Sequence, residues 1–281
     1  MSAFPLRTIR ADQAQASVSP LGAHVLSWVP NGEHPVLWTS SKASPDTHPQ
    51  HAGIPLCLPW FSSPELSTAS LAPHATQGHG FARNTLWDVL EDDGICSRTV
   101  LGMRHQRDDH GGVFPHAFSA QLEIDLGEDL DLKLTLINDD DHVISMECAL
   151  HTYLAVGDVK DVSIKGLEGS RYTDLLTGTT HKQYGPLTLV GPTDRIYHTR
   201  EALIVEDPRW LREISLETVG AMSTIVWNPW AEGVTRFTDI GPSEWTDFIC
   251  VESGNVREQA VHLAPGGRHR LHLSLHTDSL S

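Results

Sequence analysis

Cysteine is scarce in this chain of 281 residues, and its few positions are scattered. The four cysteines, Cys57, Cys96, Cys148 and Cys250, form no CxxC pair. This spacing argues against a disulfide framework and against a zinc site, and free thiols fit a reducing compartment. The N-terminus carries no apolar signal segment, and no apolar run is long enough to span a bilayer. We therefore expect a cytoplasmic protein.

Basic residues are also few. Lys and Arg together number 20 against 36 Asp and Glu, which gives a formal net charge of −16 and a sequence pI of about 5.4. A field of this sign repels the phosphates of nucleic acids and of anionic membrane surfaces, so we expect neither as a partner. Any phosphate on a small substrate would need a local cationic pocket that works against this field.

The chain lacks any sustained helical periodicity, and several runs instead alternate apolar and polar residues. Apolar side chains recur at every second position over 122–126, 130–136 and 271–275. Period-two alternation is typical of strands with one buried and one solvated face. The segment Asn138 to Asp141, between two apolar runs, predicts a hairpin. We expect an all-β sandwich or barrel that forms a single domain over residues 1–281.

Four segments could carry chemistry, although each also has an ordinary structural explanation. The segment Gly53 to Phe61 contains two prolines and fits an edge strand followed by a turn. The segment His79 to Arg83 could line a pocket, but an exposed loop explains it equally well. His151 lies in an apolar, strand-like run and could be a core histidine. Glu252 lies in a similar run, and because a buried charge is costly unless it is paired, a carboxylate there favours a functional or partnered role.

In their order along the chain, these segments resemble the hexose-6-phosphate mutarotases, the glucose-6-phosphate 1-epimerase branch of the aldose-1-epimerase superfamily. The segments Val226 to Pro229 and Leu263 to Gly266 also resemble that branch. The resemblance covers roughly residues 18 to 277, and the joint order of the motifs is more specific than any one of them. It implies a galactose-mutarotase-like antiparallel β-sandwich, and an enzyme that interconverts the α and β anomers of a hexose 6-phosphate.

The resemblance also implies a site. His151 would act as general acid toward the ring oxygen, and Glu252 as general base toward the anomeric hydroxyl. Asp194 would bind sugar hydroxyls, His79 would line the sugar pocket, and Arg83 would hold the 6-phosphate. An acid and a base beside one C–O bond suffice for this reaction, and no metal-ligand spacing such as HExxH occurs, so we expect neither a cofactor nor a metal. We expect a monomer whose partner is a small-molecule sugar or sugar phosphate.

The chain departs from this branch at one position. The branch usually has a second phosphate-binding arginine just before Gly53–Pro55, and His51 stands there in this chain. A histidine is only partly charged near neutral pH and cannot make the two-pronged contact of a guanidinium with a phosphate. Lys42 or Arg171 could compensate. Two alternatives therefore stay open: a mutarotase for an unphosphorylated aldose, and a non-catalytic carbohydrate-binding protein of the same fold, against which the retained acid–base pair argues.

Overall fold

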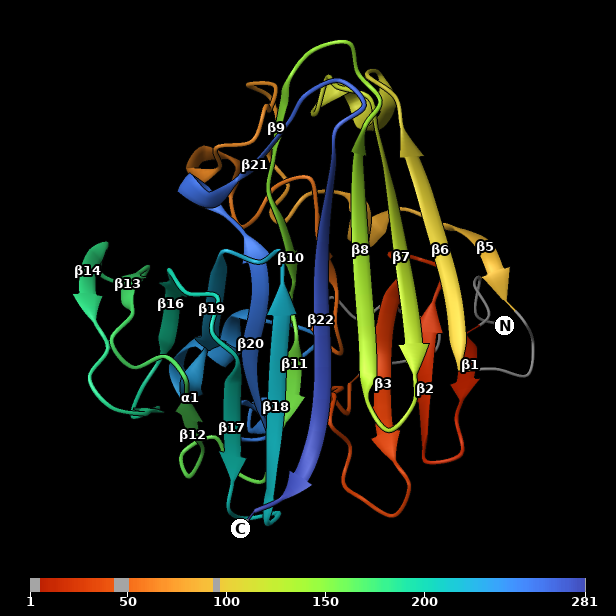
Figure 1. Ribbon diagram of the computed structural model, residues 1–281. Coiled ribbons are helices and arrows are strands. Elements are labelled where there is room, and N and C mark those ends of the chain that lie inside the picture. The colour runs from red at the N-terminus through yellow and green to blue at the C-terminus, as the bar shows by residue number, and fades with distance from the viewer. Residues whose placement is uncertain (1–5, 43–50, 93–96, 281) are drawn as a thin grey trace.

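The computed structural model describes residues 6–42, 51–92 and 97–280, and antiparallel strands dominate it (Figure 1). A nine-stranded sheet runs in the spatial order β15 (Leu187–Thr188), β12 (Ser163–Lys165), β17 (Leu203–Asp207), β18 (Arg212–Val219), β22 (Arg268–Ser279), β8 (Leu130–Asn138), β7 (Phe118–Leu126), β6 (Arg98–His105) and β5 (Asp88–Asp92). An eight-stranded sheet runs in the order β14 (Thr179–Lys182), β13 (Arg171–Asp174), β16 (Thr193–Tyr197), β19 (Ser223–Asn228), β20 (Phe248–Asn255), β10 (Cys148–Leu150) and β4 (Leu56–Cys57), with β11 (Tyr153–Ala155) also paired to β20.

Smaller elements complete the fold. One small sheet contains β1 (Arg7–Arg10), β2 (Ala14–Ser19) and β3 (His24–Pro30), and another pairs β9 (Ile144–Met146) with β21 (Val261–Leu263). Helical segments are short: α1 (Trp230–Gly233) and the 3-10 turns η1 (Pro64–Leu66), η2 (Ala82–Asn84), η3 (Asp109–Gly112), η4 (Val234–Arg236), η5 (Glu244–Thr246) and η6 (Arg257–Gln259). The main hydrophobic cluster draws on both large sheets and on β1–β3.

The alternating runs form antiparallel strands, as predicted, and the structure places them side by side in the nine-stranded sheet. In β7 and β8 every second side chain is buried, and the same alternation continues through the centre of β22. The register places the buried leucines opposite one another, with Leu134 facing both Leu122 and Leu271. Each such leucine contributes about 1.5–3 kcal/mol when it leaves water. The stripe of leucines therefore fixes which face of this sheet turns toward the core.

The predicted hairpin at Asn138 to Asp141 is wrong. Strand β8 pairs with β7 and β22, whereas the strand that follows the segment, β9, pairs with β21. The polar side chains of the segment hold other parts of the chain: Asn138 donates to the carbonyl of Leu263, and Asp140 accepts from Arg107. The segment is therefore a crossover out of the nine-stranded sheet, because the strands on its two sides pair with different partners, and its side chains make hydrogen bonds both within the segment and across the fold.

The proline-containing segment lies at a sheet edge, as predicted, and next to the strands that carry the site. Strand β4 is the last strand of the eight-stranded sheet and pairs with β10. The backbone N–H of His151 donates to the carbonyl of Pro55, and that of Tyr153 donates to Gly53. Gly53 has φ +53°, and a Cβ there would lie 2.1 Å from the carbonyl oxygen of Val25. Only glycine fits this approach, which lets the edge segment pack closely against β3.

Three of the four cysteines lie in the described part of the chain. Cys57, Cys148 and Cys250 are buried free thiols, as predicted, and Cys96 lies outside the described residues. Within residues 6–42, 51–92 and 97–280, no helix combines the length and the apolar character that crossing a membrane requires.

Candidate active site

His151 and Glu252 are brought together by the pairing of β20 with two strands at once. Strand β20 pairs with β10 before His151 and with β11 after it, so the histidine lies at a short break opposite the middle of β20. The Nε2 atom of His151 lies 3.4 Å from Oε1 of Glu252. The two groups are therefore close enough to contact the two oxygens of one anomeric centre, although 101 residues of sequence separate them.

Burial sets the protonation of this pair. Glu252 is 1% exposed, and its pKa is raised well above the ordinary range by burial and by the charge of Asp194, against the opposing charge of Arg83. The pKa of His151 is lowered first by burial and then by unfavourable electrostatic interaction with neighbouring basic groups, among them His79 and Arg83. The neutral form of each group is favoured, so the two groups share one proton, which the carboxyl holds. Oε2 of Glu252 has no hydrogen-bond partner in the part of the chain that the structure describes.

A pocket with a volume of about 150 Å³ surrounds the pair. Its lining side chains come from distant parts of the chain: His51, Phe61, Ser62, His79, His151, Tyr153, Leu175, Asp194, Trp227, Phe237 and Glu252. Five of the six residues that the sequence indicated are in this lining, and Arg83 is not. The aromatic side chains of Tyr153, Trp227 and Phe237 were not singled out from sequence, although Trp227 lies within the segment Val226 to Pro229.

Asp194 supplies a second carboxylate. It lies in β16, directly across from Trp227 of the neighbouring strand β19. Its pKa is raised to about 6 by burial and by the charge of Asp174, while the charge of Arg257 opposes the rise. Above pH ~6 the carboxylate is ionised and accepts hydrogen bonds, which suits a group that binds sugar hydroxyls.

His79 is held as a neutral ring with one defined tautomer. Its Nδ1 accepts a hydrogen bond from the backbone N–H of Ser62 at 3.3 Å and lies 3.2 Å from Sγ of Cys57. Burial raises the pKa of the Cys57 thiol to about 12 and lowers the pKa of His79 to about 3. Because Nδ1 accepts, the ring proton lies on Nε2. His79 therefore offers a ligand one N–H donor and no charge.

Arg83 lies behind this histidine and does not line the pocket. Its side chain is buried, in η2, and Nη2 donates to Sγ of Cys57 at 3.7 Å. Its charge lowers the pKa of His79 and opposes the rise in the pKa of Glu252. The resemblance implied a role as 6-phosphate ligand for Arg83, whose guanidinium contacts Cys57 and is not in the pocket lining.

His51 lies at the pocket with a carboxylate that the sequence gave no reason to expect. Its Nδ1 is 2.9 Å from Oδ1 of Asp239, and its backbone N–H donates to the same carboxylate. Its ring packs on Phe237 with 4.6 Å between the centroids. Burial acts to raise the pKa of Asp239, but the hydrogen bonds from His51 outweigh it, and the pKa lies below its ordinary value. Where the branch carries an arginine, this chain therefore presents a histidine bound to an ionised aspartate.

The sequence profile of the family described as "Aldose 1-epimerase" matches residues 5–276. The chain belongs to the aldose 1-epimerase family. A "Putative glucose-6-phosphate 1-epimerase" from Cenchrus ciliaris is 30% identical over 278 residues, which cover 92% of this chain and 80% of that protein. A protein of the same name from Escherichia coli K12 is 30% identical over 270 residues, which cover 90% and 86%.

Solved structures agree with this assignment of the epimerase. A "putative mutarotase" from Salmonella typhimurium has a TM-score of 0.85 at 26% identity, over 98% of this chain and 91% of that chain. A "Putative aldose 1-epimerase" from E. coli K12 has a TM-score of 0.78 at 15% identity, over 99% and 100%, and shows the shared fold. The predicted all-β, galactose-mutarotase-like sandwich is confirmed, and the protein is an isomerase of the epimerase class.

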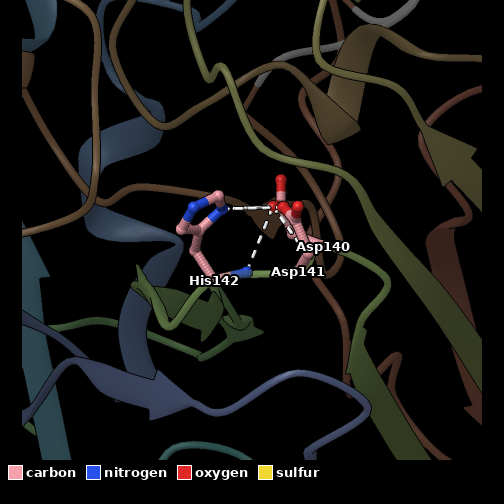
Figure 2. Close-up of side chains that lie close together, drawn as sticks. All are labelled: Asp140, Asp141 and His142. Atoms are coloured by element: carbon pink, nitrogen blue, oxygen red, sulfur yellow. Dashed lines mark hydrogen bonds and ion pairs between the residues drawn. The ribbon is translucent and has the colours of Figure 1, made fainter.

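The epimerase also has a compact group of possible metal ligands outside the pocket. Asp140, Asp141 and His142 lie together in the crossover after β8, as Figure 2 shows. Arg107 donates hydrogen bonds to both carboxylates, and the backbone N–H of Ala117 donates to Asp140. A guanidinium already compensates these carboxylates, so the group serves to hold the crossover in place.

The buried neutral histidine of the epimerase makes stability depend on pH. His79 has a pKa of about 3 in the folded state, against an ordinary value of 6.5 in the unfolded chain. Below pH 6.5 this histidine binds a proton in the unfolded chain but stays neutral in the folded chain. The free energy of unfolding therefore decreases as pH falls from 6.5 toward 3. One such proton corresponds to about 1.4 kcal/mol per pH unit near the middle of that window.

We expect the His79→Gln variant to lose the contribution of His79 to the pH dependence of the free energy of unfolding. The measurement is the free energy of urea unfolding for both proteins at several pH values between 4 and 7. The difference between the two curves reports the titration of His79 together with its electrostatic coupling to His151. Parallel curves would contradict a neutral His79.

Proposed function

We propose that this epimerase interconverts the α and β anomers of a hexose 6-phosphate by opening and reclosing the sugar ring. The observation that carries the proposal is the 3.4 Å approach of His151 Nε2 to Glu252 Oε1 inside a pocket lined by polar and aromatic side chains. A carbohydrate-binding protein without catalysis would have no use for a buried acid–base pair, because burying two titratable groups costs stability.

The chemistry follows from the single proton that the pair holds. Moving that proton from Glu252 to His151 gives a carboxylate and an imidazolium side by side. Glu252 then takes the proton of the anomeric hydroxyl while His151 gives its proton to the ring oxygen, and the C1–O5 bond breaks. The open aldehyde turns about C1–C2, the ring oxygen attacks the other carbonyl face, and both protons return. Each positioned group contributes about 10²–10⁴-fold.

The other lining residues would hold the sugar in place for this exchange. Asp194 accepts hydrogen bonds from sugar hydroxyls, and Nε2–H of His79 donates one. The faces of Tyr153 and Trp227 cover the C–H side of the ring and keep water away. Because His79 stays neutral, it orients the substrate without competing with His151 for the catalytic proton.

The preference for a phosphorylated sugar is supported by the motifs of the phosphosugar branch and by the names of the two relatives that are 30% identical. Its test is the rate of anomer exchange measured by NMR magnetisation transfer on glucose 6-phosphate, glucose and galactose side by side. We expect the highest kcat/KM for glucose 6-phosphate. A clear preference for an unphosphorylated sugar would overturn this part of the proposal and leave the mutarotase chemistry standing.

One observation favours the second candidate, a mutarotase for an unphosphorylated aldose. Asp239 places an ionised carboxylate beside His51, where an incoming phosphate would be repelled. If a phosphosugar is the substrate, Asp239→Asn should lower its KM by about 2- to 10-fold, since removing one nearby like charge at high effective dielectric is worth about 1 kcal/mol.

The matched measurement is the KM of the same variant for glucose. Loss of a repulsive charge should leave the neutral sugar unaffected. An equal change in KM for both sugars would mean that Asp239 acts through the position of His51 and not through its charge.

A further inference from the structure

One buried arginine next to the pocket has no partner for its charge. Arg257 lies in η6, two residues after the end of β20, the strand that carries Glu252. Its residue is 9% exposed, and Nη1 and Nη2 are buried without a hydrogen-bond partner in the described part of the chain. Unpaired buried charges are expensive, so two open donors on one guanidinium are typical of a site that a ligand completes.

A second buried arginine shows the ordinary arrangement. Arg212 is 5% exposed, and its two terminal nitrogens donate to the backbone carbonyls of His34, Pro35 and Ala155. The fold can therefore satisfy a buried guanidinium where the role is structural. Arg257 differs in having its terminal nitrogens left open.

The backbone of Arg257 is fixed against the pocket wall. Its N–H donates to Oε1 of Glu147 at 2.7 Å, and Oε2 of the same carboxylate accepts the N–H of Phe61, a lining residue. Thr68 donates to the carbonyl oxygen of Arg257 at 2.5 Å. The residue has φ +57°, a conformation that a non-glycine residue adopts only where its surroundings impose it. The chain thus holds Arg257 in a strained position beside Phe61.

The charge of Arg257 acts on the pocket. Among the charged neighbours of Asp194 it opposes the rise in pKa, and it helps to lower the pKa of His79. Both residues line the pocket, and Arg257 forms no ion pair with either of them. Arg257 is not itself in the pocket lining, and its geometric link to the pocket is the Glu147 carboxylate, which accepts hydrogen bonds from both Arg257 and the lining residue Phe61.

We propose that Arg257 is the residue that receives the anionic group of the substrate, and so determines specificity for a sugar phosphate. This inference rests on the proposed function and assigns a binding residue to the 6-phosphate of the substrate. A guanidinium fork binds two phosphate oxygens at once, and the two open nitrogens are the pair that such a contact uses. Position 51 supplies no arginine, and Arg83 donates to Cys57, so Arg257 provides the cation that the histidine at position 51 cannot.

The test compares two variants with the wild type on two substrates. Arg257→Gln removes the charge and Arg257→Lys keeps the charge without the fork. We expect Arg257→Gln to raise the KM for glucose 6-phosphate about 10- to 100-fold, the range of a charge-assisted double hydrogen bond, and Arg257→Lys to recover part of the loss. KM and kcat for glucose should change much less than those for glucose 6-phosphate, the remaining change coming from the loss of the Arg257 charge that lowers the pKa of Asp194. Arg83→Gln is the matched control, because it removes the other buried guanidinium near His79.

Three outcomes would overturn the assignment. They are an equal loss on both sugars, no loss on either, and a selective loss in Arg83→Gln without one in Arg257→Gln. Thermal unfolding of each variant is measured alongside. Arg257→Gln should be no less stable than the wild type, because it removes an unpaired buried charge, and Arg257→Lys keeps the comparison open if the glutamine fails to fold.

A second probe separates this inference from the proposed function. If the wild type does not exchange glucose 6-phosphate, the phosphosugar function fails, and inorganic phosphate is then tested as a competitive inhibitor of glucose exchange. Inhibition that Arg257→Gln weakens about 10-fold or more would support an anion site at this residue. Absence of inhibition at tens of millimolar phosphate, or inhibition that both proteins share equally, would overturn it.

Discussion

Replacing Glu252 with glutamine should lower the catalysed rate of anomer exchange by about 10²–10⁴-fold, the share of a positioned acid–base group. Glutamine keeps the shape of the side chain and its distance to His151, but it cannot take the anomeric proton. The rate is measured by NMR as exchange between the anomers of the preferred sugar at several enzyme concentrations. The fall should appear in kcat, since the hydroxyl contacts of Asp194 and His79 remain.

The fold of this variant provides the control. The pKa of Glu252 is higher in the folded chain than in the unfolded chain. Above the ordinary pKa of a glutamate, the carboxyl must therefore take up a proton on folding, and this lowers the stability. Its removal should leave the thermal midpoint at pH 7 unchanged or higher. His151→Gln should be about as slow, and the double variant should be no slower than either single one, because the two groups act as a unit. Near-wild-type exchange in either single variant would remove that residue from the mechanism.

Replacing Glu147 with alanine should destabilise the protein by about 3–5 kcal/mol, as expected when a fully buried charged partner is removed. The carboxylate is 0% exposed and accepts hydrogen bonds from the backbone N–H groups of Phe61, Thr68 and Arg257 and from the hydroxyls of Ser67 and Thr68. Alanine would leave these donors buried without an acceptor. The measurement is the free energy of unfolding in urea.

Two further variants show whether the loss comes from this hydrogen-bond network. Glu147→Gln keeps one acceptor oxygen and should lose less than alanine does. Glu217, an exposed carboxylate in β18, is the matched control, and Glu217→Ala should change stability by no more than about 0.5 kcal/mol. A Glu147→Ala variant as stable as this control would show that water replaces the carboxylate without cost.

The strands of the nine-stranded sheet could be predicted from sequence because the signal is local. In β7, β8 and β22 the alternation of apolar and polar residues directly states which face is buried. Asn138 to Asp141 misled the same reasoning, because turn-forming residues also suit a crossover. What decides between a hairpin and a crossover is the distant partner, here Arg107 and the carbonyl of Leu263, and no local pattern contains it.

The site shows the same division. His151 and Glu252 could be named from motifs, and the pairing of β20 with β10 and β11 explains how they meet. Asp239 could not be found, because it is 188 residues from His51 and lies in a loop without pattern. Arg257 follows the Glu252 segment closely, yet only its burial and its open nitrogens set it apart from any other arginine. The sequence therefore identifies the catalytic candidates that lie within motifs. Which charged groups have partners elsewhere in the fold can be seen only in the structure.

Strand β22 lies in the middle of the nine-stranded sheet, between β18 and β8, although it comes last among its strands along the chain (Figure 1). Its contacts with β8 span more than a hundred residues, a topology that folds slowly. During synthesis, the strands on either side of β22 are made before it. Until β22 pairs with them they form two half-sheets, each with an unpaired edge at which aggregation can begin. Final insertion of β22 therefore couples the two halves, and a chain cut before it would lose the whole sheet and not one strand.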